Sequence, residues 1–93
     1  MQILFEQPDS KGSFFVDDNG ELLAIMTFSK VGDRIIIDHT EVSNALRGKN
    51  VGKQLVAAAV EHARKSNLKI LPLCPFAKSV FEKVKEYQDV LDQ

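Results

Sequence analysis

A short basic turn within residues 42–55 has the residue types of a phosphate-binding loop. Gly48 and Gly52 give the turn a flexible backbone, and three cations lie beside them: Arg47, Lys49 and Lys53. The residues that follow are rich in alanine and have helical periodicity, so the turn precedes a helix N-terminus. Unpaired backbone N–H groups and the helix dipole both favour an anion at that end. The segment therefore predicts that a phosphate group binds here.

Two other interpretations use the same residues. A nucleoside-triphosphate loop fits less well, because Gly48 lies too close to Gly52 and Lys53, and Gln54 replaces the magnesium-binding Ser or Thr. A plain turn before a helix, with exposed lysines around it, needs no ligand at all. Short glycine motifs often occur without a ligand, so this second alternative stays open.

Cys74 is a candidate nucleophile. It directly precedes Pro75, and proline favours the first position of a helix, so Cys74 is expected to be the N-cap. A thiolate at that position is stabilised by the helix dipole and by free backbone amides. The alternative is a buried cysteine that behaves as a small apolar side chain.

His39 is the second candidate for chemistry. It lies near the end of an expected strand over residues 34–42, and Glu41 has the same side-chain parity and can orient its ring. Histidine titrates near neutral pH, so His39 is a candidate general base toward Cys74 or an incoming amine. A structural hydrogen-bonding role is the alternative, since buried polar groups are usually satisfied.

The composition narrows the class of protein. A chain of 93 residues is expected to form one domain, residues 1–93, with one core. The net charge of −1 lacks the basic excess that nucleic-acid binding requires, so no nucleic-acid partner is expected. One cysteine excludes an internal disulfide, and no Cys or His spacing predicts a metal site. Without a membrane-length apolar stretch or a signal-like start, the expected location is the cytoplasm, with no membrane partner.

The first half of the chain has the pattern of strands. Four are expected, over residues 3–6, 11–17, 21–30 and 34–42. Asn19 and Gly20 predict a tight hairpin because both residues tolerate positive φ, and Gly32 with Asp33 predicts the next turn. Short turns between consecutive strands indicate an antiparallel meander.

The second half changes to helical periodicity. A helix is expected over residues 51–66, and its apolar stripe consists of Val51, Leu55, Ala58, Ala59 and a structural His62. Residues 69–73 form a short strand that a helical crossover places parallel to the fourth strand. Pro75 opens a second helix, whose expected buried face carries Phe76, Val80, Val84, Tyr87 and Leu91. The fold class is therefore α+β.

The basic turn resembles the acyl-coenzyme A loop of the GCN5-related N-acetyltransferases. The family pattern is Arg or Gln, two residues, Gly, one residue, then Gly or Ala. Arg47 and Gly52 match this pattern, and Asn50 replaces the first glycine, a change that Asn accommodates because it tolerates positive φ. The resemblance implies acetyl-CoA as the ligand, held by Val42, Arg47, Gly48, Lys49, Asn50, Val51, Gly52 and Lys53.

The order of elements is also similar to a minimal form of this family's fold. It has the antiparallel four-strand meander, a helix, a fifth strand parallel to the fourth, and a C-terminal helix. It looks like the small single-domain members that carry a Cys-Pro-Phe-Ala-Lys segment. The two helices that usually follow the first strand, and the usual sixth and seventh strands, are missing. The acceptor side should therefore be open, which suits a protein tail or an extended amine.

The second half matches the family's framework but not its chemistry. The pattern Asn, two residues, Ala, three residues, Tyr occurs here as Cys74, Ala77 and Phe81. In the family that tyrosine often protonates the departing thiolate, and Phe81 has no proton to give. The resemblance places Cys74 close to the bound thioester, which a thiolate can attack. The catalytic candidates are thus Cys74 and His39.

Three functions agree with these residues. The first is transfer of an acetyl group from acetyl-CoA to an amine or a protein lysine, a transfer in which Cys74 can carry the acetyl group. The second is a binding module for acetyl-CoA that acts as a sensor or acyl carrier without efficient turnover. The third is a small interaction domain without a ligand. Coenzyme binding separates the third from the other two, and turnover separates the first from the second.

Overall fold

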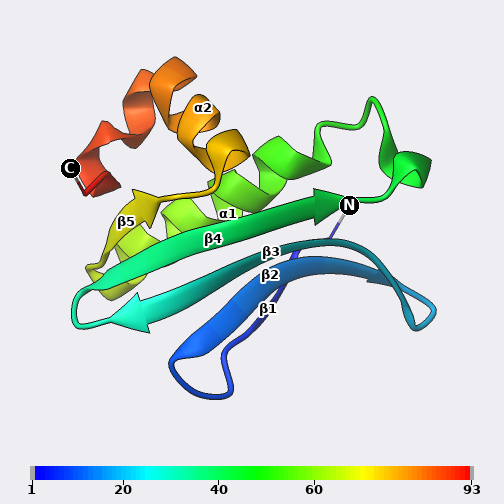
Figure 1. Cartoon of the computed structure of the whole chain (residues 1–93), viewed down its shortest axis with the longest axis horizontal. Coiled ribbons are helices and arrows are strands. Elements are labelled where there is room, and N and C mark those ends of the chain that lie inside the picture. The colour runs from blue at the N-terminus through cyan, green and yellow to red at the C-terminus, as the bar shows by residue number, and fades with distance from the viewer. Residues whose placement is uncertain (1, 93) are drawn as a thin grey trace.

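The computed structural model describes residues 2–92. Within them, five strands form one sheet in the order β1-β2-β3-β4-β5 (Figure 1). The strands are β1 Leu4–Glu6, β2 Lys11–Asp18, β3 Glu21–Val31, β4 Arg34–Val42 and β5 Lys69–Pro72. Neighbouring strands from β1 to β4 are antiparallel, whereas β5 pairs with β4 in parallel. The predicted meander and the parallel fifth strand are confirmed.

The turns between strands have the backbone conformations that their residues favour. Asn19 (φ 52°) and Gly20 (φ 85°) make the hairpin between β2 and β3. Gly32 (φ 62°) makes the turn between β3 and β4. Positive φ at both central positions matches the right-handed twist of the flanking strands, which explains why this hairpin was predictable.

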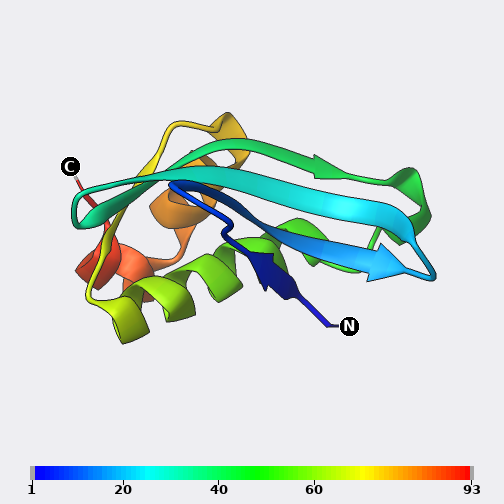
Figure 2. The ribbon, with the colours of Figure 1, turned by 90° about the horizontal axis from the view of Figure 1, so that it is seen from below.

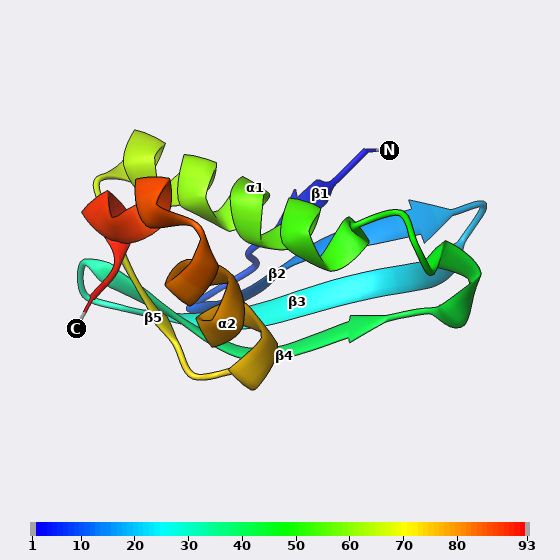
Figure 3. The ribbon, with the colours of Figure 1, turned by 90° about the horizontal axis from the view of Figure 1, so that it is seen from above.

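Both helices cover the same face of the sheet (Figures 2 and 3). Helix α1, Val51–Ser66, packs against β2, β3, β4 and β5, and it also contacts α2, Pro75–Lys83. It ends at the predicted boundary, where Asn67 adopts a left-handed conformation (φ 56°, ψ 47°). No helix among residues 2–92 covers the opposite face of the sheet.

The buried face of α1 is rotated from the predicted stripe. Its buried residues are Val51, Leu55, Val56, Ala59, Val60 and Ala63. Ala58 and His62 are only partly buried. The His62 ring lies against an aromatic cluster, with its centroid 4.7 Å from Phe5 and 5.8 Å from Phe14. Burial lowers the pKa of His62, which agrees with the predicted structural role.

The second helix is shorter than predicted. Helix α2 ends at Lys83, because Val84 adopts an extended conformation (φ −101°, ψ 98°), and the 3₁₀ helix η2, Lys85–Val90, follows. Side chains from other segments stabilise the chain after this helix end. The side chain of Gln88 donates to Phe81 O (2.9 Å), and Arg64 of α1 donates to Glu86 O (2.8 Å). The helical periodicity from Phe76 to Leu91 therefore predicted a longer α-helix than the chain forms.

None of the helices in residues 2–92 has both the length and the apolar character that crossing a bilayer requires.

Arg64 joins α1 to η2 and provides a test of this packing. Its guanidinium contacts both carboxylate oxygens of Asp89, at 3.0 and 2.9 Å. We expect Arg64→Ala to speed amide hydrogen exchange in η2 while α1 stays protected, because η2 loses the hydrogen bonds that the Arg64 guanidinium donates to it. Lys65→Ala, at the next exposed position, should change neither element. Equal exchange in both variants would contradict this assignment.

The same contact predicts a pH dependence. The hydrogen bond from Arg64 holds the pKa of Asp89 below its ordinary value. A carboxylate with a depressed pKa stabilises the fold above its unfolded pKa, and this contribution is lost as the pH falls through the folded pKa. The difference between Arg64→Ala and the unmodified protein should therefore disappear in acid.

Candidate functional site

The loop between β4 and α1 has the backbone of an anion-binding turn. It begins with the 3₁₀ helix η1, Asn44–Leu46, in which the buried Leu46 anchors the loop to the core. Gly48 then adopts φ 81°, and Asn50 is left-handed at φ 57°, ψ 32°. Asn50 therefore keeps the conformation expected of the glycine that it replaces.

The end of this loop presents unused hydrogen-bond donors. The first backbone N–H groups of a helix have no partner within the helix, and those of α1 belong to Val51, Gly52 and Lys53. The N-cap residue Asn50 makes no side-chain hydrogen bond to them. Arg47 is exposed and bonds Asn44 Oδ1 through Nη2 at 3.3 Å. This combination of free amides and cationic side chains can hold a phosphate group.

A cleft of about 440 Å³ opens beside this loop. Its lining residues are Thr40, Val42, Leu46, Arg47, Gly48, Asn50, Val51, Gly52, Lys53 and Phe76. The structure thus brings together seven of the eight predicted coenzyme-binding residues. Lys49 is the exception, and its carbonyl accepts a hydrogen bond from Gln54 Nε2 (3.0 Å).

Phe76 lies in this cleft and not on the buried face of α2, where it was predicted. It is 39% exposed, whereas the adjacent Ala77 is buried. Its ring packs on the first turn of α1, because Gly52 has no side chain there. A Cβ atom at position 52 would lie 2.7 Å from Phe76 Cζ, which is too close for the ring to stay. Gly52 therefore allows an aromatic wall to form beside the free amides.

The strands β4 and β5 separate at the inner end of this cleft. Their last paired residues are Ile37 and Pro72. Beyond them, the N–H groups of Leu73 and Cys74 both donate to Ile37 O, at 2.9 and 3.0 Å. β4 then continues to Val42 with no strand on this edge, while the chain after β5 turns into α2. We call the point where the two strands diverge the gap; Thr40, on this part of β4, lines the cleft.

Cys74 lies at this point of separation and is the N-cap of α2, as predicted. It is 6% exposed, and its Sγ lies 3.4 Å from Thr40 Oγ1. Burial alone would raise the pKa of this thiol. Hydrogen bonds from Thr40 and from the first backbone amides of α2 outweigh that effect and lower the pKa of Cys74 below its ordinary value. The site thus makes this thiol more acidic than an ordinary cysteine.

The structure places His39 on the opposite face of the sheet from Cys74. A β-bulge in β4 is the reason: Thr27 faces His39 while the next residue, Phe28, faces Ile37, so Asp38 is an extra residue. Thr40 takes the inward position as a result. The His39 side chain is 61% exposed, and its Nε2 lies 3.1 Å from Glu41 Oε2. The expected pairing of His39 with Glu41 is therefore present, but on the outer face.

No tyrosine reaches this site within residues 2–92. Phe81 is 1% exposed in the core, and the Tyr87 ring packs against it at 5.8 Å. No group of three or more His, Cys, Asp and Glu side chains in the described part of the chain could hold a metal ion.

Thr40 is expected to control the reactivity of Cys74. Thr40→Val removes a hydrogen bond that stabilises the thiolate, so the pKa of Cys74 should rise and its reaction with iodoacetamide should need a higher pH. Thr27→Val is the control, because Thr27 bonds Asp38 on the outer face. Identical pH profiles for both variants would exclude a role for Thr40.

Comparison with known proteins agrees with this fold. A family model described as GCN5-related N-acetyl-transferase matches residues 13–90. The NMR structure of a GCN5-like protein from Staphylococcus aureus is 46% identical, with a TM-score of 0.72 over 96% of this chain and 87% of that one. The chain belongs to the GCN5-related N-acetyltransferase family. No curated protein matches it at a significant level.

More distant structures share the fold. The ribosomal-protein-S18-alanine N-acetyltransferase of Escherichia coli is 16% identical, with a TM-score of 0.68 over 83% of this chain. An acetyltransferase structure from Clostridium acetobutylicum that contains acetyl-CoA is also 16% identical, with a TM-score of 0.63 over 80% of this chain. This chain spans 53% and 56% of those two proteins, respectively.

Two residues of the site were not predicted as part of it. No sequence pattern indicated that Thr40 belongs to the site, because regular alternation along β4 would direct its side chain outward. Phe76 had a signal in retrospect: it lies in the first turn of α2, directly after the N-cap and Pro75, at the level of Cys74. A residue in that turn can face a ligand that approaches the helix N-terminus.

Proposed function

We propose that this protein transfers an acetyl group from acetyl-CoA to an amine. The observation that carries the proposal is the cleft itself, in which free helix amides, the Arg47 loop and the Phe76 ring lead to the gap at Cys74. The loop amides, Arg47 and Lys53 would hold the pyrophosphate, and the gap between β4 and β5 would admit the pantetheine arm. Acetyl-CoA supplies the activated acetyl group.

Two routes for the transfer are consistent with the geometry. In the direct route, a neutral amine nitrogen attacks the acetyl carbonyl, a C–N bond forms, the C–S bond breaks, and the coenzyme leaves as a thiolate. In the second route, the Cys74 thiolate first takes the acetyl group in a thioester exchange and then passes it to the amine. For an amine that reaches the gap from the outer face, His39, paired with Glu41, would accept the proton that the amine loses.

Phe81 supports a second candidate function. A buried phenylalanine cannot protonate a leaving thiolate, so a module that binds acetyl-CoA as a sensor or acyl carrier would have this same cleft. The two functions differ in turnover. Release of coenzyme thiol in the presence of an amine panel supports the enzyme, whereas tight binding without release supports the module.

An amide-resolved NMR titration with coenzyme A tests both candidates. The largest shifts should fall on residues 48–53, where the backbone donors of the loop would contact the pyrophosphate. Residues 19–20, in the β2–β3 turn, provide an internal reference that should not move. Saturating coenzyme without shifts in residues 48–53 would remove the transferase and the binding module together.

His39 should affect turnover as the proposed acceptor of the amine proton. The rate of thiol release should rise with pH, because the attacking amine must be neutral. His39→Ala should lower the rate sharply. Tyr87→Phe should be nearly silent, because Tyr87 packs against Phe81 away from the cleft. An unchanged rate in His39→Ala would exclude His39 as the base.

A further inference from the structure

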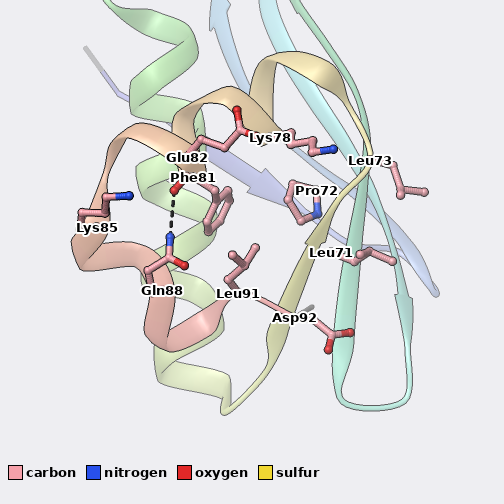
Figure 4. A pocket seen from close by; sticks show the side chains of 10 residues that line it. All are labelled: Leu71, Pro72, Leu73, Lys78, Phe81, Glu82, Lys85, Gln88, Leu91 and Asp92. Atoms are coloured by element: carbon pink, nitrogen blue, oxygen red, sulfur yellow. Dashed lines mark hydrogen bonds between the residues drawn. The ribbon is translucent and has the colours of Figure 1, made fainter.

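A second hollow, separate from the coenzyme cleft, lies between β5 and the C-terminal part of the chain (Figure 4). Its volume is about 610 Å³, and we call it the β5 groove. The groove is lined by Leu71, Pro72, Leu73, Lys78, Phe81, Glu82, Lys85, Gln88, Leu91 and Asp92. Leu73 and Lys78 lie at one end of the groove, and Leu91 and Asp92 lie at the other.

The β5 groove has an apolar interior that the chain leaves exposed. Leu73 is 60% exposed, and Leu71 and Leu91 are partly exposed, although all three are large aliphatic side chains. Phe81 closes the inner side of the groove. Contiguous apolar surface of this kind, bordered by polar groups, is typical of a site for a partner's side chains.

The backbone of β5 limits how a partner can bind. Asp92 N already donates to Ile70 O (2.8 Å), which closes one end of the strand's free edge. Leu73 N–H points toward β4, so the carbonyl of Pro72 points to the free edge, where proline offers no N–H. A partner strand therefore could not form a continuous ladder. Side-chain anchors and charge must provide most of the recognition.

The rim of the β5 groove has an excess of unpaired positive charge. Lys78, Glu82 and Lys85 form one row along α2 and the start of η2, and none of them makes an ion pair within residues 2–92. The other carboxylate, Asp92, is already paired with Arg34 Nε at 3.3 Å. Two free lysines against one free glutamate favour an anionic partner over a cationic one.

The groove leads directly to the proposed reaction site. Leu73 ends the groove, and Cys74 is the next residue, at the gap between β4 and β5. An extended chain advances about 3.3–3.6 Å per residue. A peptide anchored along the groove would thus place a neighbouring lysine side chain within reach of that gap.

Resting on the proposed transferase function, we propose that the β5 groove binds the acceptor, and that the acceptor is a polypeptide. Its amine is a lysine side chain flanked by apolar and acidic residues. Aliphatic side chains fill the groove between Leu73 and Leu91, and carboxylates pair with Lys78 and Lys85. The groove thereby selects peptide acceptors with acidic surroundings over basic ones.

Two synthetic peptides test this inference by NMR, first without coenzyme. The first has two leucines and two glutamates before a single lysine, and the second has serines and arginines in their place; both have blocked ends. The first peptide should shift the amides of Leu71, Leu73, Lys78 and Lys85, and the second should not. Equal binding of both peptides, or shifts outside the groove alone, would overturn the inference.

Charge reversal supplies the matched variants. Lys78→Glu combined with Lys85→Glu should raise the dissociation constant of the acidic peptide roughly three- to thirtyfold, because two exposed ion pairs become repulsive. Lys83→Glu, on the same helix but outside the groove, should leave it unchanged. Equal effects from both changes would show a general charge effect and overturn the inference.

Turnover gives the second readout. The KM for acetylation of the acidic peptide should rise in the double variant, while the response of residues 48–53 to coenzyme A stays as in the unmodified protein. If residues 48–53 respond to coenzyme A but neither peptide binds the groove, the proposed function stands and this inference fails. If coenzyme A does not bind, the proposed function fails, and the acceptor role of the groove fails with it.

Discussion

Gly48→Pro should abolish most of the coenzyme affinity of this protein. Gly48 has φ 81°, and proline fixes φ near −65°, so the loop cannot keep its path from η1 to α1. The change would move the free amides of residues 51–53 together, whereas Arg47→Ala removes a single side chain. Loss of one charge-assisted contact costs about 1.5–3 kcal/mol, or roughly a tenfold to hundredfold change in affinity. Calorimetric titration should show a larger loss for Gly48→Pro than for Arg47→Ala.

Gly32→Pro is the matched control for this experiment. Gly32 also has positive φ (62°) and lies in an open turn, between β3 and β4 and away from the cleft. It should lower stability without a comparable change in coenzyme affinity. Circular dichroism would show that both variants are folded. A folded Gly48→Pro protein with unchanged affinity would exclude the loop from the site.

Cys74→Ala should abolish an acetyl adduct that the unmodified protein forms with acetyl-CoA. The thiolate of Cys74 would attack the acetyl carbonyl, its new C–S bond would replace the bond to the coenzyme, and the coenzyme would leave as a thiolate. Binding holds the two sulfur atoms near each other, which gives the reaction a high effective concentration. Intact-mass measurement would detect the adduct and its loss.

Cys74→Ser separates chemistry from packing. Serine is a favourable N-cap, so α2 and the coenzyme cleft should stay intact. Its hydroxyl does not ionise near neutral pH, so no stable adduct should form. If the unmodified protein binds acetyl-CoA but its mass does not change, Cys74 is a packing residue and only the direct route remains.

These two experiments also distinguish the proposed functions. A Cys74→Ser protein that still releases thiol with an amine uses the direct route. A protein that forms the adduct but transfers it to no amine is an acyl carrier. In either case Gly48→Pro should lower the activity, because coenzyme binding precedes any acyl transfer.

Local features of the fold were predictable from the sequence. Asn19 and Gly20 adopt the positive φ angles expected of them, and Pro75 begins α2. Such conformations depend on the residue and its immediate neighbours, since steric limits on φ act within one or two residues. The same reason explains why Asn50 could be expected to keep the turn of the coenzyme loop.

Orientation within an element was less predictable. Phe76 belongs to a helical stripe by spacing, but it is 39% exposed, and its ring lies on Gly52 of α1 instead of in the core. The end of α2 depends on Arg64 and Gln88, which reach it from other segments. Tertiary contacts of this kind override a weak local preference for helix.

The sequence by itself determined the meander, the helix that crosses to a parallel strand, the glycine-containing basic loop and the cysteine at a helix start. Only the tertiary structure decided which strand residues meet that cysteine. One extra residue, Asp38, reverses the side-chain alternation in β4, so Thr40 faces Cys74 and His39 faces outward. A bulge forms where β3 and β4 pair with one residue more on β4, and a shift of one residue exchanges the faces of the sheet. Residue spacing along one strand cannot reveal it.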